Sequence, residues 1–428
     1  MTLTKQKLKQ YALLFTLFGL LIVVSTNILA KAGILFSLGT YASIVIMYVS
    51  IIIFAKFAYN VGLKHVPKFL SIVYRLLISW FILQIIRGAL IANNYWEYKL
   101  LFFNSLTFTL ISLVFFLGNN LNITKYIFQK YLYAILPIAI VLLPLTHNVA
   151  NQLFSRLAIP VTILLLFIPY IKKKWIIILT VIMIISILSE PGFRTGFIKI
   201  GVSLLLLIGL YTKLLNSKTV KSIIFLTMLA LPIIMLTLGI IGSYNIFEKL
   251  SENEDLEYKI EVGDKLQKQN IDTRSFLYEE VLEDLISTDN LLFGKSPSQG
   301  YKSYFFYNNG GAMNGIRYSS EVNILNLMLY FGLVGCMLMV ILVISVSYYG
   351  IFKSNNKLAI TLGFLLLSRY LLFFIEEFTQ FNFNFYFFWL VMGLVASKQF
   401  RSMNESQIKL WVRNIFNKSS KQSISLNK

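Results

Sequence analysis

The chain has 428 residues, of which 57% are hydrophobic and 14% are charged, and its mean hydropathy is +0.70. This composition excludes a water-soluble globular protein, and the length is far more than a single anchor helix needs. The formal net charge of +20 suggests a nucleic-acid-binding protein, but the positions of the charges, described below, exclude that class.

Apolar segments follow one another along most of the chain. An α-helix needs about 20 mostly apolar residues to cross the hydrocarbon core of a bilayer. The short alternating strands of an outer-membrane barrel are absent from the sequence. We therefore predict an all-α polytopic membrane protein with about twelve transmembrane helices. They are expected at residues 11–30, 34–56, 69–91, 100–118, 126–145, 156–170, 174–189, 197–212, 222–242, 321–346, 358–375 and 383–397.

Basic residues lie in short loops on alternate sides of this bundle. They are Lys5, Lys7, Lys9, Lys64, Lys68, Lys172, Lys173, Lys174, Lys213, Lys218, Lys221, Lys353 and Lys357, followed by a basic tail. Positive loops face the cytoplasm, so both termini are predicted to be cytoplasmic. Every acidic residue except Glu405 then lies outside or at the outer rim. The predicted organisation is helices 1–9 in 1–242, a large external loop at 243–320, helices 10–12 in 321–397 and a basic cytoplasmic tail at 398–428.

The external loop divides into two parts. Its first part, about 251–269, is charged and has few large apolar residues, which is typical of a solvated segment. An amphipathic helix is predicted from Arg274, with Asp272 or Thr273 as its N-cap. Its apolar positions are Tyr278, Val281, Leu282, Leu285 and Ile286, and its polar positions are Glu279, Glu280, Glu283 and Asp284. A turn-rich passage at 290–300 and an aromatic cluster at 301–307 follow it.

Several kinds of site are excluded by residue counts and missing motifs. Cys336 is the single cysteine, so an intramolecular disulfide is excluded. The two histidines, His65 and His147, are predicted on opposite sides, which excludes a histidine-based metal cluster. No glycine-rich phosphate loop is present. A nucleotide-activated donor on the inner side is therefore not expected, and any chemistry is expected outside.

Six arginines are predicted on the outer side of the bundle: Arg87, Arg156, Arg194, Arg274, Arg317 and Arg369. An arginine inside a transmembrane helix costs about 2.5–3.5 kcal/mol on insertion scales and usually faces protein, water or an anion. Arg87 is near its helix end, where its side chain could instead extend to the interface. Arg369 could instead pair with Glu376 or Glu377. If the arginines converge, they form a site for a diphosphate or another polyanion.

Carboxylates and aromatic residues complete the candidate site. Glu190 is in a tight outer turn with Arg194, either as a local ion pair or as a ligand-binding group. Glu321 begins the helix after the loop, either as an N-terminal cap or as a general base. Tyr301 and Tyr304 belong to the aromatic cluster at 301–307.

The loop and its flanks contain motifs that resemble the Wzy family of O-antigen and capsular polysaccharide polymerases, which includes related O-antigen ligases. The matching segments are Arg274-Ser-Phe-Leu-Tyr278, Asn290-Leu-Leu-Phe-Gly294, Ser320-Glu-Val-Asn-Ile-Leu325, Tyr330-Phe-Gly-Leu-Val-Gly335 and Phe193-Arg-Thr-Gly196. Many members, ligases especially, have a histidine just before the helix that follows the loop. This chain has Glu321 there, which favours a polymerase over a ligase and leaves the identity of the base open.

The resemblance implies glycosyl transfer from a polyprenyl-diphosphate-linked oligosaccharide to the non-reducing end of another lipid-linked unit, without metal or nucleotide cofactor. Glu321, Arg274 and Arg194 are the implied catalytic residues, with Glu321 as the first choice of base and Glu190 as the second. The other arginines, Glu190, Tyr301 and Tyr304 would bind the diphosphate or the glycan, although the aromatic cluster could instead pack against the membrane domain. The implied location is the bacterial cytoplasmic membrane, with an extracytoplasmic active side, and a chain-length regulator is a further candidate partner. A flippase or transporter of lipid-linked glycans is the rival hypothesis, although it has little need of a large external loop.

Overall fold

The computed structural model describes residues 2–31, 38–146, 152–190, 194–240, 260–262, 265–267, 273–303, 315–377 and 380–417. These residues are almost entirely helical. The first part of the predicted external loop, residues 243–272, lies outside the described residues apart from two three-residue strands, and so do residues 304–314.

Helices occupy each of the apolar stretches of the sequence. The first half contains α1 (Thr2–Lys31), α2 (Leu38–Val61), α3 (Lys68–Ile91), α4 (Tyr95–Ser105), η1 (Leu106–Leu110), α5 (Val114–Gly118), α6 (Leu121–Lys130), η2 (Tyr131–Ile135) and α7 (Leu136–Thr146). The middle contains α8 (Gln152–Ala158), α9 (Val161–Leu164), η3 (Leu165–Tyr170), α10 (Lys173–Ser189), α11 (Arg194–Tyr211), η4 (Leu214–Asn216) and α12 (Lys218–Ile240).

The last part combines the described loop elements with the final helices. These are α14 (Thr273–Ser287), α16 (Asn323–Phe352), α17 (Lys357–Leu372), α18 (Phe383–Ala396), α19 (Lys398–Ser402) and α20 (Glu405–Ile415). Two antiparallel hairpins pair β1 (Ile260–Val262) with β2 (Lys265–Gln267), and β3 (Tyr301–Lys302) with β4 (Ile316–Arg317). In the second hairpin, Tyr301 is opposite Arg317.

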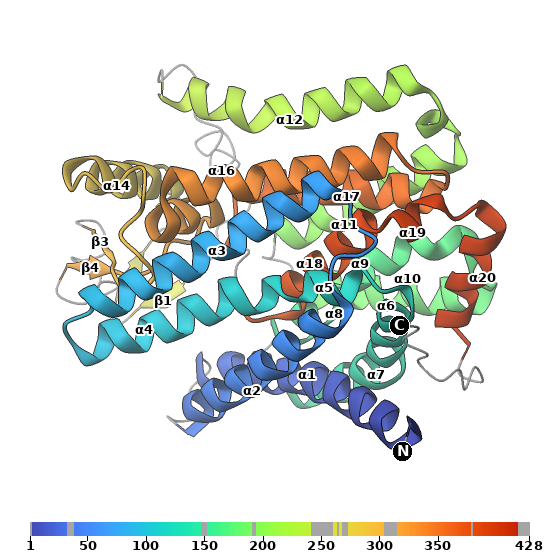
Figure 1. Cartoon of the computed structure of the whole chain (residues 1–428), viewed down its shortest axis with the longest axis horizontal. Helices are drawn as coiled ribbons and strands as arrows, with labels where there is room; N and C mark the ends of the chain where they lie inside the picture. Colours follow the sequence, from blue (N-terminus) through green and yellow to red (C-terminus); the bar gives the residue numbers. More distant parts are fainter. Residues whose placement is uncertain are drawn as a thin grey trace.

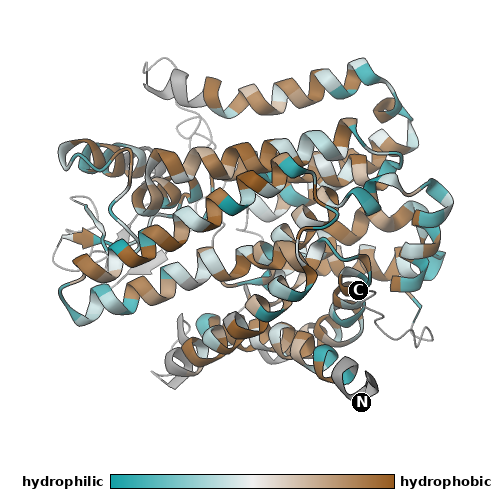
Figure 2. Ribbon diagram, viewed as in Figure 1, coloured by the Kyte–Doolittle hydropathy of each residue, from teal (hydrophilic) through white to brown (hydrophobic). Residues whose placement is uncertain are grey.

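Several of the longer helices, among them α3, α4, α12 and α16, run roughly along the long axis of the molecule, whereas α1 and α2 lie at an angle to them (Figure 1). The two ends of the molecule differ. The loop elements α14, β3 and β4 lie at the left end, together with the start of α4. The short helices α19 and α20 lie at the right end. Hydrophobic residues cover the middles of the helices, and hydrophilic residues gather at the right end (Figure 2). We call the left end the loop end and the right end the tail end.

Six helical segments in the described part of the chain are long and apolar enough to cross a membrane. They are Lys7–Leu29, Ala42–Val61, Lys68–Ile91, Tyr95–Gly118, Leu121–Pro144 and Asn323–Phe352. Shorter apolar helices cover Val161–Tyr170, Thr195–Tyr211 and Phe383–Ala396. The architecture is therefore that of an all-α membrane protein, as the composition predicts, while the number of twelve spans stays a prediction.

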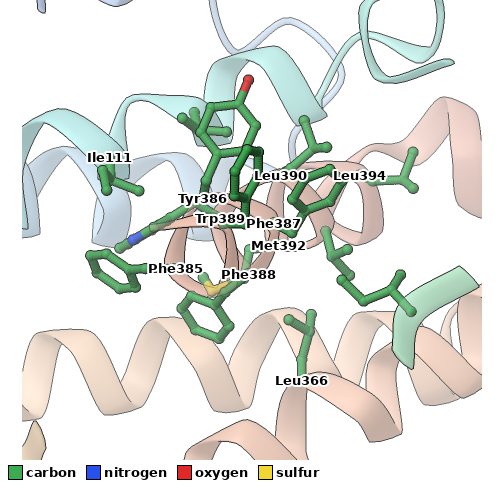
Figure 3. Close-up of a cluster of buried hydrophobic side chains, with 14 of the residues drawn as sticks. Ile111, Leu366, Phe385, Tyr386, Phe387, Phe388, Trp389, Leu390, Met392 and Leu394 are labelled. Carbon is green, nitrogen blue, oxygen red and sulfur yellow. The ribbon is translucent and has the colours of Figure 1, made fainter. Parts of the chain in front are cut away.

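Helix α18 lies at the centre of the core. Its sequence, FNFYFFWLVMGLVA, is apolar on every side, and all its residues are buried. A helix that is hydrophobic all round has no face for water and must be surrounded by other elements. Figure 3 shows its aromatic side chains pointing outward in several directions, toward residues such as Ile111 and Leu366. The short distance between α18 and α5 depends on Gly118 and Gly393, because a Cβ at either position would lie 2.1 Å from a backbone oxygen.

Helix α16 is interrupted at Gly332, which has φ +65° and ψ −174°. Backbone groups released by this break are bonded by the turn after α14. The amides of Leu333 and Val334 donate to the carbonyl oxygens of Leu291 and Leu292 at 3.0 and 3.3 Å. The Leu329 carbonyl oxygen accepts from the amide of Lys295 at 2.7 Å. Broken backbone inside a bundle needs such partners, so the break and the turn form one structural unit.

The amphipathic helix predicted after residue 273 is confirmed as α14, but its buried face is shifted from the predicted one. Leu277, Val281 and Leu285 are fully buried, whereas Ile286 is 60% exposed. Asp284, predicted on the polar side, is buried and forms an ion pair with Lys295. The prediction for these two residues was wrong because tertiary pairing places a carboxylate on the inner face, where hydropathy alone predicts an apolar residue.

At the tail end, groups in and next to α19 and α20 accept hydrogen bonds from the ends of other helices. Asn356, buried before α17, donates its side-chain amide to the carbonyl oxygens of Phe400 and Met403 at 3.0 and 3.1 Å. The Glu405 carboxylate accepts from the Tyr170 hydroxyl at 3.0 Å and from the Lys357 amide at 2.6 Å. These bonds join helix ends that are far apart in the sequence.

Candidate functional site

Charged side chains meet inside the bundle between α8, α10, α11 and α17. The innermost pair joins Lys199 of α11 to Glu376, which lies in the turn after α17, with 2.5 Å between Nζ and Oε1. The two side chains are only 1% and 9% exposed. Ionisable residues at such positions in a membrane protein are rare, and they often belong to functional sites.

A second pair lies beside the first, at the end of α10. The guanidinium of Arg156 in α8 lies 3.6 Å from the Glu190 carboxylate, and the Ser155 hydroxyl donates a hydrogen bond to the same carboxylate. Burial raises the pKa of Glu190, and the charge of Arg156 and the bond from Ser155 oppose that rise. Lys199 also acts on Glu190 by its charge. The two pairs therefore form one electrostatic cluster.

Arg369 of α17 supplies the third cation. It is 4% exposed, and its Nη2 donates to the Thr162 hydroxyl of α9 at 3.1 Å. It is close enough to Lys199 and Glu376 for their charges to interact. Its Nη1 is buried without a hydrogen-bond partner among the described residues. One donor of this guanidinium thus stays available for another oxygen atom.

A pocket adjoins this cluster, and the space enclosed within it is about 20 Å³, enough for about one water-sized group. Its polar lining consists of Ser155, Thr162, Ser186, Glu190 and Lys199. A smaller pocket, beyond Ile159, is lined mainly by apolar side chains and contains Arg369 and Asn384. The hydrogen bond between Arg369 and Thr162 links the walls of the two pockets.

This arrangement can bind an anion and accept a proton. Three cations and two carboxylates give the cluster a net charge of about +1 when all five groups are ionised. Cations in a water-poor environment stabilise negative charge on an oxygen far better than exposed cations do. Glu190 is a carboxylate with a raised pKa in the same pocket as Lys199, which is typical of a general base.

Three of the predicted site residues come together here, namely Arg156, Glu190 and Arg369. Arg194 is the first residue of α11, five residues before Lys199, but its side chain lies outside the described residues. The side chain of Arg274, near the start of α14, is likewise outside the described part. Tyr304 lies entirely outside the described residues.

The other predicted residues lie elsewhere and have structural partners. Arg87 of α3 donates to the Gly294 carbonyl oxygen at 2.7 Å and to the Asn290 side chain at 3.0 Å, so it holds the turn after α14. Arg317 of β4 pairs with Glu321 at 3.1 Å. The Glu321 side chain is 55% exposed and does not line the pocket. The predicted first choice of base is therefore at the surface, and the second choice lines the pocket.

Tyr301 of β3 is completely buried, which leaves no ring face for a sugar. Burial raises its pKa to about 12, although the charge of Arg317 opposes the rise. The burial of Tyr301 favours packing, the alternative role considered for this aromatic cluster, over binding of glycan.

Lys199 is the member of the cluster that the sequence analysis missed. Its signal is visible in Phe197-Ile198-Lys199-Ile200, a lysine alone within an apolar helix, and such a residue requires an explanation in a membrane protein. Glu376 was considered only as a partner of Arg369. Ser155 and Thr162 carry no recognisable signal, because hydroxyl groups are common in transmembrane helices.

In the part of the chain that the structure describes, no three histidine, cysteine, aspartate or glutamate residues are grouped so that they could hold a metal ion. No protein-family model, no curated protein and no solved structure matches this chain with significant similarity.

Proposed function

We propose that this protein is a polysaccharide polymerase of the bacterial cytoplasmic membrane. It transfers a glycan from a polyprenyl-diphosphate carrier to the non-reducing end of another lipid-linked unit, on the extracytoplasmic side. The observation that carries the proposal is the convergence of Arg156, Lys199 and Arg369 beside an open pocket that also holds a carboxylate. The loop motifs that resemble the Wzy family support the same reaction.

The cations have a direct role in this reaction. Breaking the bond between the anomeric carbon and the diphosphate oxygen leaves negative charge on the departing diphosphate. Preorganised cations stabilise this charge as it develops, and each such group typically contributes about 10²–10³-fold to the rate. Arg369 has an unbonded donor among the described residues, and Lys199 lines the pocket. Both are therefore proposed to bind diphosphate oxygens.

Glu190 is proposed as the general base. It removes the proton from the acceptor hydroxyl, the hydroxyl oxygen forms a bond to the anomeric carbon, and the carrier diphosphate departs with the electrons of the broken bond. Its position in the pocket and its raised pKa support this assignment over Glu321. A raised pKa favours this role, since proton abstraction is most effective when the pKa of the base is near the working pH.

The closed tail end supports an enzyme over a transporter. A flippase must open the bundle alternately to both sides of the membrane. Here the tail end is held by the bonds of Asn356 and Glu405 and by the bond of the Lys398 amide to the His65 carbonyl oxygen at 2.7 Å. Transfer on one side of the membrane does not require this end to open, whereas a flippase would have to move the helix ends that these bonds join.

The decisive test uses purified protein in liposomes with a polyprenyl-diphosphate oligosaccharide. We expect a ladder of longer glycans on gel analysis, and we expect Glu190→Gln to lower its rate by at least about 100-fold. Glu321→Gln is the matched control, a carboxylate outside the pocket, and should retain most of the activity. Movement of the oligosaccharide across the membrane without lengthening would overturn the proposal. Transfer of the glycan only to an acceptor other than a lipid-linked unit would indicate a ligase.

The pH dependence gives a second test of the base. Because burial raises the pKa of Glu190, activity should fall on acidification at a higher pH than an ordinary glutamate would give. Arg156→Met removes the positive charge that opposes this rise, so the acidic limb of the pH–rate profile should move to still higher pH. An acidic limb that stays in place in Arg156→Met, in protein of normal stability, would contradict the role of Glu190.

A further inference from the structure

The turn between α17 and α18 connects the charge cluster to the external loop. Glu376 from this turn pairs with Lys199 inside the cluster. The backbone of the same turn accepts hydrogen bonds from two other elements of the loop region. The turn therefore contacts Lys199 through a charged side chain, and its backbone also binds the start of α16 and the helix α14.

The first of these connections is to the start of α16. The Asn323 amide donates to the Glu376 carbonyl oxygen at 3.0 Å, and the Ile324 amide donates to the Phe373 carbonyl oxygen at 2.9 Å. The first amides of a helix have no partner within the helix, so this turn caps α16. Glu321 is two residues before Asn323, so a shift of the turn would also shift Glu321.

The second connection is to α14. The Tyr278 hydroxyl donates to the Phe374 carbonyl oxygen at 2.8 Å. Leu277 and Val281, on either side of Tyr278 along this helix, are fully buried. A change in the position of the turn must therefore either break this hydrogen bond or move α14.

The electrostatics of the cluster indicate what could move the turn. Lys199 lines the open pocket, while its ammonium is already paired with Glu376. A phosphate oxygen that enters the pocket would compete with the Glu376 carboxylate for this ammonium. Arg156 and Arg369 add positive charge next to Lys199, and this charge favours the more negative of the two competing anions. A diphosphate carries more negative charge than a single carboxylate, so it is favoured over Glu376.

We propose that the Glu376 carboxylate pairs with the Lys199 ammonium in the diphosphate site as long as no substrate is bound. The diphosphate of the substrate then displaces this carboxylate from Lys199. Displacement shifts the turn, and the turn moves α14 and the start of α16. Substrate binding is thereby coupled to the external loop. This inference rests on the proposed function and adds a positioning residue to it, because Glu376 itself does not take part in bond formation.

The test measures binding of inorganic pyrophosphate to detergent-purified protein by calorimetry. Glu376→Gln removes the competing charge, and the affinity for pyrophosphate should rise by at least about fivefold, the lower range of typical coupling between sites. Glu377→Gln is the matched control, because this neighbouring carboxylate accepts a hydrogen bond from Gln380, whereas the carboxylate that pairs with the Lys199 ammonium is that of Glu376. If Glu376 only orients Lys199, the affinity of Glu376→Gln will be unchanged or weaker, and the proposal is overturned.

A second readout follows the loop itself. A fluorophore is attached to Ser287→Cys, an exposed position of α14, in a Cys336→Ala background. Pyrophosphate should change the fluorescence of the otherwise native protein, and the change should be lost in Glu376→Gln. Tyr278→Phe should keep pyrophosphate binding and lose most of the fluorescence change, and this variant decides the matter if Glu376→Gln fails to fold.

The outcomes separate the two proposals. A native protein that does not bind pyrophosphate contradicts the diphosphate site and with it the proposed function. Native binding without any fluorescence change, or with the same change in Tyr278→Phe, contradicts only the coupling through the turn.

Discussion

Replacement of Arg369 by alanine is expected to lower the rate of glycan polymerisation by at least about 100-fold. This arginine is 4% exposed, binds Thr162, and has a free donor among the described residues. In the proposed reaction, the departing diphosphate develops negative charge beside this buried cation, where the interaction with a fixed cation is strong. Arg369→Lys keeps the positive charge but loses the planar guanidinium, which can bind two oxygen atoms at once, so we expect a smaller loss of rate than in Arg369→Ala. The rate is measured from the glycan ladder in liposomes.

Removing a buried cation also affects folding, so the controls must separate the two effects. Thr162→Val removes the hydrogen-bond partner of Arg369 and keeps the guanidinium, and it should cost much less activity than Arg369→Ala. Arg413→Ala changes an exposed arginine of α20 at the tail end and should have no effect on rate. If Arg369→Ala elutes and melts like the native protein and works within about twofold of its rate, Arg369 does not bind the diphosphate.

The second large effect is on stability and concerns Gly332, where α16 breaks. The residue has φ +65°, and a Cβ there would lie 2.2 Å from the Leu292 carbonyl oxygen. The left-handed conformation alone costs a side chain about 1–3 kcal/mol. The clash is with backbone that cannot rotate away, so the total for Gly332→Ala should be about 3 kcal/mol or more. Thermal unfolding in detergent should show a clearly lower midpoint.

Gly201 provides the matched control for this experiment. It lies within α11, and a Cβ there would have nothing within 4 Å. Gly201→Ala should therefore be neutral or stabilise the protein by about 0.5–1 kcal/mol, because alanine favours the helix. If both variants melt at the same temperature, the turn after α14 is not locked to the break in α16 as the hydrogen bonds indicate.

The break at Gly332 also explains two of the motifs in physical terms. The sequence shows Asn290-Leu-Leu-Phe-Gly294 and Tyr330-Phe-Gly332 as separate glycine-containing segments. In the structure, Gly294 and Gly332 are in contact, and a Cβ at Gly294 would lie 2.6 Å from the Gly332 nitrogen. Arg87 holds the same turn from α3. No sequence spacing predicts this contact, because it joins segments through backbone groups that have no side-chain pattern.

The sequence by itself determined the class of the protein. Long apolar stretches have to leave water and satisfy their backbone groups internally, so an all-α membrane architecture follows from composition and periodicity. The amphipathic helix after Thr273 follows from the same periodicity. Individual charged residues in apolar helices, such as Arg369 and Lys199, are also visible as candidates, because their burial has to be compensated.

Only the tertiary structure decided which charges meet. Arg87 and Arg369 look alike in sequence, yet Arg87 binds a turn and Arg369 joins the cluster with Lys199. Glu321 and Glu190 both follow from the sequence as candidate bases, and only Glu190 lines the pocket. The position of a charge along a helix is local information, whereas its partners depend on how the helices rotate and pack. Packing depends on the whole chain, and the site is therefore a property of the fold.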